Sequence, residues 1–360
     1  MGATTKNQHF VPRLLLKNFS EDEDGPVQIF DSERDILRPP TSIRRVLSQN
    51  NFYDDDNVIE NFLALNVEAP AAPIIKSIIA SPTATIPAHC IDLLRFIAVQ
   101  MNRTPQALDT SLEVIDKYSK TIFQRIGELN GFSADTMAGL KLKMTDERSL
   151  LGMQTLDGAL NWPLLEDLSW HVLSNGTDLP FLISDHPVVY YNWYLRHAND
   201  PSYTSLTKAG IQIFMPLSPS ITLALVDGAT YKIGIKGAHQ TLLTNRADVE
   251  LLNSLQLRAR DTFVVFPMGM DPDYVRRRCK EYPASSLFRN HAWSSVPEDI
   301  GDDQLKSIHA VWRTQTVLPE WLSFSKIKRR VAKKGPLCSD RVPEVVGAHK
   351  VFMQRIRRSS

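Results

Sequence analysis

The stretch GIQIFMPLSPSITLALVDG, from Gly210 to Gly228, decides the fold class. It holds two apolar runs of strand length, and similar runs lie nearby in LSWHVLSNG, PFLISDHPVVYYNW and DTFVVFP. Runs rich in β-branched and aromatic residues are typical of strands. Only NRADVELLNSLQLRA, between the last two strands, has the pattern of a helix. Because regular alternation of strand and helix is absent, we predict a mixed or largely antiparallel sheet over residues 161–267.

Helical periodicity dominates the preceding part of the chain, from about residue 54 to residue 160. An apolar stripe of helical spacing ends at Met101, and the same spacing resumes beyond Pro105. An earlier helix is capped by Asp56 or Asn57, and we expect it to end or kink near Ala69, where two prolines follow. Before these helices, VQIFD and DILRP predict a β-hairpin. The sequence therefore predicts an α+β fold, with an N-terminal, mostly helical part packed against a sheet from the second half.

The bulk composition argues against several broad classes of protein. Of the 360 residues, 43% are hydrophobic and 22% are charged, as in globular proteins. The formal net charge of +1 gives no strong global field, so a nucleic-acid partner would have to meet a local basic patch. Three scattered cysteines argue against a disulfide framework or a zinc cluster. With no secretory signal and no uninterrupted apolar segment of roughly 20 residues, we predict a cytoplasmic protein without a membrane partner.

The polar residues NQH, directly ahead of the apolar run FVPRLLLKNF, form the first candidate site. His9 could act as a general base or bind a metal ion, because its unperturbed pKa lies near neutrality. The alternative is a histidine that caps or bridges the first element of the fold.

Two pairs of polar residues in the helical part are further candidates. Glu60 and Glu68 are eight residues apart, which places them on one helix face, where they could bind a hard divalent cation or share acid–base chemistry. Gln100 and Arg103 lie at i and i+3, and a guanidinium group suits forked contact with phosphate. The alternatives are a solvated face for the carboxylates and a structural salt bridge between Arg103 and Glu60 or Glu68.

The segment ISDHPVV places Ser184, Asp185 and His186 within an apolar run. A carboxylate at the end of a strand could bind a metal ion or take part in catalysis. The alternative is a turn in which Asp185 accepts hydrogen bonds from nearby backbone amides. Consecutive strand residues point to opposite faces, so the three residues do not make a Ser-His-Asp triad. The sequence contains no G-x-S-x-G elbow, Walker loop, H-E-x-x-H helix or dinucleotide fingerprint.

Basic residues gather in the last part of the chain. They could contact the phosphates of RNA or DNA without sequence preference, or they could form a solvated surface. The candidates for nucleic-acid binding are Lys326, Lys328, Arg329, Arg330, Lys333 and Lys334.

Several of these segments occur in an order that resembles a bacterial family of uncharacterised proteins. The resemblance rests on the leading Q-H-x-x-P-x3-L-x2-F element, the later S-D-x-P-V segment and the stretches between them, and it spans about Asn7 to Phe266. It implies one α+β domain over residues 7–267, followed by a C-terminal extension, 268–360, with a basic tail. The family has no assigned activity, so the resemblance supplies no catalytic residues. His186 stands where Asn is expected more often.

The sequence leads to two hypotheses of function. In the first, the protein is a metal-assisted hydrolase, most simply a phosphodiesterase or nuclease that serves as a toxin or phage-defence effector. Glu60, Glu68 and Asp185 would bind Mg²⁺ or Mn²⁺, His9 would act as base or ligand, and Arg103, with Gln100 beside it, would stabilise phosphate charge. In the second, the protein is a binding or regulatory module, and the same residues form a buried structural network.

Overall fold

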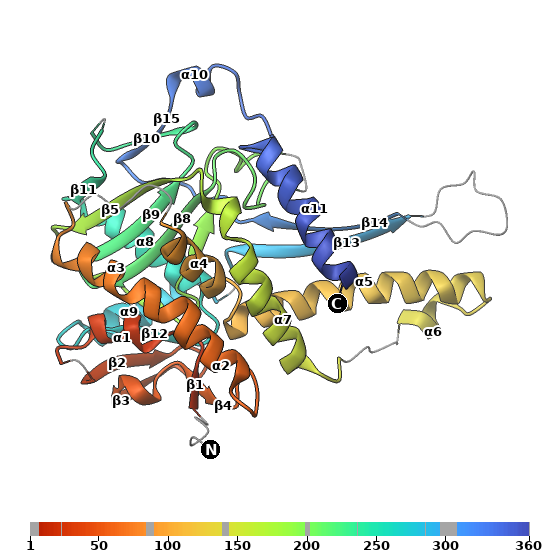
Figure 1. The fold of residues 1–360 in the computed structure, drawn as a ribbon, viewed down its shortest axis with the longest axis horizontal. Helices are drawn as coiled ribbons and strands as arrows, with labels where there is room; N and C mark the ends of the chain where they lie inside the picture. The colour runs from red at the N-terminus through yellow and green to blue at the C-terminus, as the bar shows by residue number, and fades with distance from the viewer. Residues whose placement is uncertain are drawn as a thin grey trace.

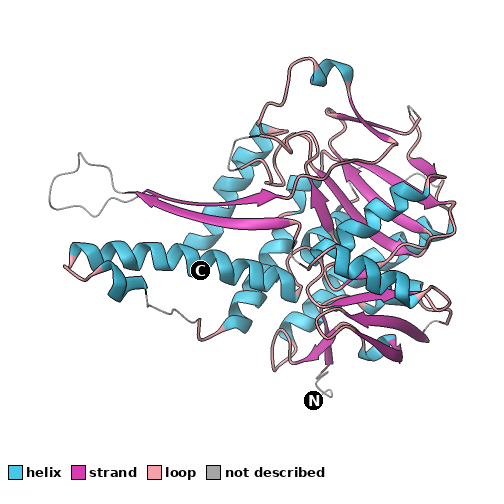
Figure 2. Ribbon diagram, turned by 180° about the vertical axis from the view of Figure 1, so that it is seen from behind, coloured by secondary structure: helices cyan, strands magenta, loops and turns pink. Residues whose placement is uncertain are grey.

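The computed structural model describes residues 7–22, 24–83, 90–138, 144–198, 202–235, 237–284, 286–295 and 308–359. These residues fold into the α+β class that the sequence predicts. Figure 1 shows the main body of sheets and helices and an arm that projects from it. The arm consists of α5 (Pro105–Leu129) and the hairpin of β13 (Phe288–Ser295) and β14 (Ile308–Gln315), which lie side by side in Figures 1 and 2.

A five-stranded sheet with the order β11–β5–β9–β8–β7 forms the centre of the body. The stretch 210–228 supplies β8 (Gln212–Ser218) and β9 (Ile221–Val226), which pair antiparallel as predicted. The pair of β11 with β5 is parallel, so the sheet is mixed but largely antiparallel. The other strands are β5 (Ser169–Asn175), β7 (Val189–Tyr191) and β11 (Gln240–Leu243).

Both faces of this sheet are buried, which explains why β8 and β9 are continuously apolar. On one face, Ile213 and Met215 belong to a core cluster shared with the helical part of the chain. On the other face, Phe214 belongs to a second cluster that includes apolar residues of α8 (Arg246–Ala259). The sheet therefore separates two hydrophobic cores.

A second, antiparallel sheet has the order β3–β2–β12–β6. The predicted N-terminal hairpin is confirmed as β2 (Pro26–Asp31) and β3 (Ile36–Ser42). It pairs with β12 (Phe263–Phe266), which in turn pairs with β6 (Ile183–Ser184). This sheet was not predicted from the sequence, because its strands are distant in the chain and no local pattern encodes their pairing. Two short pairs join β1 (Asn7–His9) to β4 (Ser48–Asn50) and β10 (Tyr231–Ile233) to β15 (Ser325–Ile327).

The helix predicted to end or kink near Ala69 continues instead. It runs from α2 (Val58–Leu63) through a π-helical segment, η3 (Ala64–Glu68), into α3 (Ala69–Ala80). A π-helical turn forms i→i+5 hydrogen bonds and widens the helix. It lies directly ahead of the first proline, which removes one N–H and would crowd a regular turn. The whole helix is long and apolar enough to cross a membrane by length and composition, which is weak evidence because core helices pass the same test.

The other predicted helices are confirmed as α4 (Ile91–Gln100), α5, α7 (Glu147–Leu160) and α8. The Thr104 side chain caps α5, and Pro105 occupies its first turn, where a missing N–H costs nothing. The Asn245 side chain caps α8 by accepting a hydrogen bond from the Ala247 N–H. The shorter helical elements are α1 (Arg13–Leu16), η1 (Lys17–Phe19), η2 (Ile43–Arg45), α6 (Ala134–Ala138) and η4 (Trp162–Leu165).

The residues after 267 contribute to the second core. Leu287, Leu318 and Leu322 are buried in it, and β15 extends the edge formed by β10. The described residues of this part of the chain also form the helices α9 (Pro272–Glu281), α10 (Arg329–Ala332) and α11 (Pro343–Ser359).

Candidate functional site

The leading Q-H-x-x-P element is fixed to the protein by its glutamine. Gln8 Nε2 lies 2.9 Å from three acceptors, the Asp54 carbonyl, Asp54 Oδ1 and Asn57 Oδ1. Gln8 Oε1 accepts a hydrogen bond of 2.7 Å from the Tyr53 backbone N–H. The side chain is completely buried, so these contacts tie β1 to the turn that leads into α2.

The carbonyl groups that follow Gln8 are bound by helix side chains. The His9 carbonyl accepts from Tyr53 Oη at 3.1 Å and from Arg103 Nη2 at 3.4 Å. The Phe10 carbonyl accepts from Gln100 Nε2 at 2.8 Å and from Arg103 Nε at 3.3 Å. Gln100 and Arg103, predicted as catalytic residues, therefore position the backbone at the end of β1 and directly after it.

Arg103 is also paired with a carboxylate. Its Nη1 lies 2.8 Å from Glu68 Oε1, and the side chain of Arg103 is 1% exposed against 26% for Glu68. Each of its guanidinium nitrogens therefore has a partner within the protein. The structural salt bridge considered in the sequence analysis is present, and a role for Arg103 in binding phosphate does not fit this arrangement.

Glu60 differs from the polar residues around it, which are held by hydrogen bonds or ion pairs. It is half-buried, and within the described part of the chain no hydrogen bond or ion pair involves its carboxyl group. Burial raises its pKa to about 7; Arg103 opposes this rise, while Glu68 and Asp54 add to it. A carboxyl group that exchanges its proton near neutrality is suited to general acid–base catalysis.

His9 lies near the same charged residues. Burial lowers its pKa, the Ile43 carbonyl opposes that effect, and the electrostatic influence of Glu68 and Arg103 also acts on the ring. His9 Nε2 lies 3.2 Å from the Ile43 carbonyl oxygen, which can only accept, so Nε2 carries the proton. In the neutral ring Nδ1 therefore presents a lone pair.

Asp185 does not join Glu60 and Glu68. Its carboxylate accepts hydrogen bonds from the backbone N–H groups of Asp261, Thr262 and Phe263, at 2.8, 2.7 and 2.6 Å. Burial raises its pKa to about 6, against the effect of these three donors. Asp185 thus forms the backbone-binding turn that the sequence analysis kept as the alternative. Among the residues that the structure describes, no group of three or more His, Cys, Asp or Glu side chains could hold a metal ion, so the predicted ligand set is not assembled.

The histidine of the same motif connects it to the helical part. His186 Nδ1 lies 2.6 Å from Thr104 Oγ1. Thr104 Oγ1 also accepts a hydrogen bond from the Ala107 N–H, so one hydroxyl joins the start of α5 to the His186 ring. Burial lowers the pKa of His186 to about 3, which keeps the ring neutral. This contact was not predicted from the sequence, in which the Thr-Pro pair at the start of α5 is a signal of the helix cap and not of its histidine partner.

The basic residues predicted to bind nucleic acid lie elsewhere. They belong to β15, α10 and the loops beside them, and Figures 1 and 2 both show this region at the end of the molecule opposite β1. Lys328 differs from the rest, because its Nζ donates to the Gly228 carbonyl. The exposed members of the set are Lys326, Arg329, Arg330, Lys333 and Lys334.

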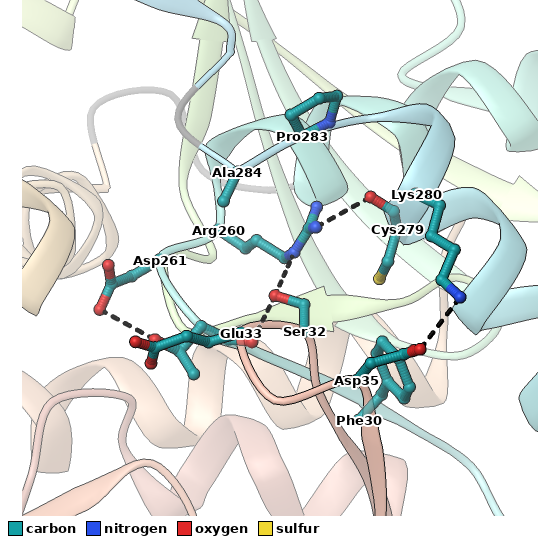
Figure 3. A pocket seen from close by; sticks show the side chains of 11 residues that line it. Phe30, Ser32, Glu33, Asp35, Arg260, Asp261, Cys279, Lys280, Pro283 and Ala284 are labelled. Carbon is teal, nitrogen blue, oxygen red and sulfur yellow. Dashed lines mark hydrogen bonds and ion pairs between the residues drawn. The ribbon is translucent and has the colours of Figure 1, made fainter.

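The molecule also has cavities away from His9 and Glu60. One of about 540 Å³ lies between α9 and the β2–β3 turn, as Figure 3 shows. Its cationic groups are already bound: Arg260 donates to Ser32 Oγ and to the Cys279 and Tyr282 carbonyls, and Lys280 pairs with Asp35. Arg260 thus satisfies carbonyls near the C-terminal end of α9, a role that cations take at helix ends.

Comparison with known proteins gives a family and no activity. A family model described as a protein of unknown function, DUF4238, matches residues 7–267. A search of curated proteins and a search of solved structures gave no match.

Proposed function

The chain belongs to the DUF4238 family, whose description assigns no activity, and we propose from its geometry that it is a hydrolase of nucleic-acid phosphodiesters. Glu60 is the group on which the proposal rests. It would transfer the proton in the chemical step, as general base to an attacking water or as general acid to the leaving oxygen.

The observation that supports this role is an unpaired, half-buried carboxyl with a pKa of about 7. Such a group costs stability when it ionises, and strongly perturbed titratable groups cluster at functional sites. Glu68 differs, since Arg103 keeps it paired. The two carboxyl groups of one helix face therefore have unequal environments, and that inequality assigns proton transfer to Glu60.

His9 is the second proton-transfer group in the proposal. Its lowered pKa leaves the ring neutral at pH 7, with Nδ1 able to accept a proton or a hydrogen bond. Gln100 and Arg103 act through the backbone of β1 and are positioning residues.

The substrate class is proposed from the basic surface of β15 and α10. Its distance from Glu60 means that it would bind the backbone of a long polyanion and not the scissile phosphate. Mg²⁺ or Mn²⁺, expected from the sequence, has no three-residue ligand group among the described side chains, so no step of the proposal passes through a cation.

A binding or regulatory module is the second candidate. The buried, paired side chains of Gln8, Gln100 and Arg103 favour it, because satisfied polar networks rigidify a fold without any chemistry.

Cleavage assays separate the two candidates. Single- and double-stranded RNA and DNA are incubated with wild type, Glu60→Gln, His9→Ala and the exposed control Glu320→Gln, each with Mg²⁺, with Mn²⁺ and with a chelator. We expect Glu60→Gln to lose at least 100-fold in rate, as general acid–base groups do. Absence of cleavage by folded wild type on every substrate would reject the hydrolase and favour the module.

A further inference from the structure

The projecting arm has an outer surface that takes no part in the proposed hydrolysis. In the arm, the β13–β14 hairpin lies beside α5, as Figures 1 and 2 show. Asn290 of β13 faces this helix, because its side-chain amide donates to Glu113 Oε2 of α5 at 2.8 Å. Consecutive strand residues point to opposite faces. Arg289, His291 and Trp293 therefore lie on the outer face of the hairpin, away from α5.

The outer face is aromatic and open to solvent. His291 lies opposite Trp312 of β14, and their rings stack with centroids 5.4 Å apart and an angle of 16° between the ring planes. Trp293 is 48% exposed, and its side chain has no ring contact or hydrogen bond among the described residues. Because a tryptophan usually buries its ring and satisfies its N–H group, an indole left in this state is available to a ligand.

The spacing of the rings along β13 suits a planar ligand. His291 and Trp293 are two residues apart in an antiparallel strand, which separates their attachment points by about 6.8 Å. Stacked bases in a nucleic acid are about 3.4 Å apart. A base inserted between the two side chains would therefore lie at stacking distance from both.

The charge of the hairpin suits a polyanion. Its two strands, FRNHAWSS and IHAVWRTQ, contain two arginines and no acidic residue. Arg313, on the side of α5, is bound to Asn290 and to the Tyr190 hydroxyl. Arg289 is exposed, and in the part of the chain that the structure describes its side chain has no hydrogen bond or ion pair. Exposed aromatic rings beside an unpaired cation are typical of sites for single strands, whereas a second copy of this face would bring like charges together.

We propose that the outer face of the β13–β14 hairpin binds a single-stranded nucleic acid, with bases stacked on Trp293 and on the His291–Trp312 pair and a phosphate at Arg289. A duplex shows only the edges of its bases in the grooves, so this face selects unpaired strands. RNA and DNA share the chemistry that is recognised. The inference rests on the proposed function and narrows its substrate class to single strands.

Fluorescence anisotropy of the full chain, with a chelator present, tests the proposal. The labelled probes are oligo(U) and oligo(dT) of about 12 nucleotides, within the usual site sizes, and RNA and DNA duplexes of the same length. The variants are Trp293→Ala, the conservative Trp293→Tyr and Arg289→Gln. The matched control is Phe123→Ala, which removes an aromatic side chain of α5 that is 44% exposed on the same arm.

We expect Trp293→Ala to weaken the binding of single strands about fivefold or more, as the loss of one stacked base does. Trp293→Tyr should retain most of the affinity, and Phe123→Ala should bind as the wild type does. Arg289→Gln should reduce the slope of the logarithm of affinity against the logarithm of salt concentration by about 0.7, the effect of one phosphate contact. Affinity for the duplexes should be the same in Trp293→Ala and in the wild type. The stronger of the two single-stranded probes identifies the nucleic acid as RNA or DNA.

The proposal is overturned if Trp293→Ala and Arg289→Gln bind single strands as the wild type does, or if Phe123→Ala weakens binding as much as Trp293→Ala. It is also overturned if the wild type elutes as a dimer that Trp293→Ala dissociates, because a second copy then covers this face. Arg289→Gln removes a side chain without partners, so it keeps the test valid if Trp293→Ala fails to fold. Binding is measured without turnover: cleavage that needs Glu60 but not Trp293 rejects this face alone, and binding of single strands without cleavage rejects the hydrolase alone.

Discussion

Replacement of Glu60 by Gln should stabilise the protein in a pH-dependent manner. In the unfolded chain the carboxyl ionises near the ordinary value of 4.5, whereas in the fold burial raises its pKa to about 7. Between these values the folded state binds the proton more tightly than the unfolded state does. The free energy of unfolding of the wild type therefore falls as pH rises through this window, and the loss is complete above pH 7.

The size of the effect follows from the pKa difference. A difference of one in pKa corresponds to about 1.4 kcal/mol, which sets a ceiling of about 3 kcal/mol on the cost of ionised Glu60. Because the side chain is partly open to solvent, screening reduces this to about 2 kcal/mol. Gln does not titrate and has nearly the same shape as the protonated acid. The free energy of unfolding of Glu60→Gln should therefore exceed that of the wild type by about 2 kcal/mol at pH 8, and the two values should be equal near pH 4.5.

Urea unfolding followed by circular dichroism, at several pH values between 4.5 and 8.5, measures these differences. Glu320→Gln, at an exposed position, is the matched control and should follow the wild type at every pH. The reasoning about Glu60 is refuted if the variant and the wild type change in parallel with pH. A stabilised variant that has also lost cleavage would link the cost in stability to the proposed chemistry.

Four further outcomes are expected. Asp185→Asn should destabilise by about 2–4 kcal/mol in urea unfolding, because an amide cannot accept from all three N–H groups; loss of activity with unchanged stability would contradict this. Arg103→Met should cost about 3–5 kcal/mol in the same measurement, since it leaves Glu68 unpaired and removes one of the two donors to each of the His9 and Phe10 carbonyls, and a cost below about 1 kcal/mol would refute the positioning role. Between pH 7 and pH 4.5, the free energy of unfolding of His186→Asn should fall by about 2.5 kcal/mol less than that of the wild type. The wild-type ring has a pKa of about 3 in the fold, so in this pH range it gains a proton only on unfolding, which lowers the stability of the wild type. Equal losses in the two proteins would show that the ring titrates normally. Replacement of Arg329, Arg330, Lys333 and Lys334 by Gln should lower RNA affinity in fluorescence anisotropy and flatten its salt dependence, whereas an unchanged slope would remove this surface from the proposed interface.

Local pattern in the sequence was enough to predict many elements of the fold before residue 267, but none of the helices and strands after it. The strands of 210–228, the helices on either side of Thr104 and the hairpin ahead of residue 40 all follow from periodicity or capping over a few residues. The helix that was predicted to end or kink near Ala69 continues through a π-helical segment, which a rule based on proline alone does not foresee.

Spacing along the chain also placed Glu60 and Glu68 on one face, but only the tertiary structure made them different. Arg103 reaches Glu68 and leaves Glu60 unpaired, and burial then sets the pKa of the free carboxyl. The role of Asp185 could not be predicted from the sequence either, because its partners lie 76 to 78 residues away. Their backbone N–H groups donate to both oxygens of its carboxylate. The sequence by itself determined which residue types were available and which elements present them. Which of those groups remain free was decided by distances between remote atoms and by access to water, and no local pattern encodes either.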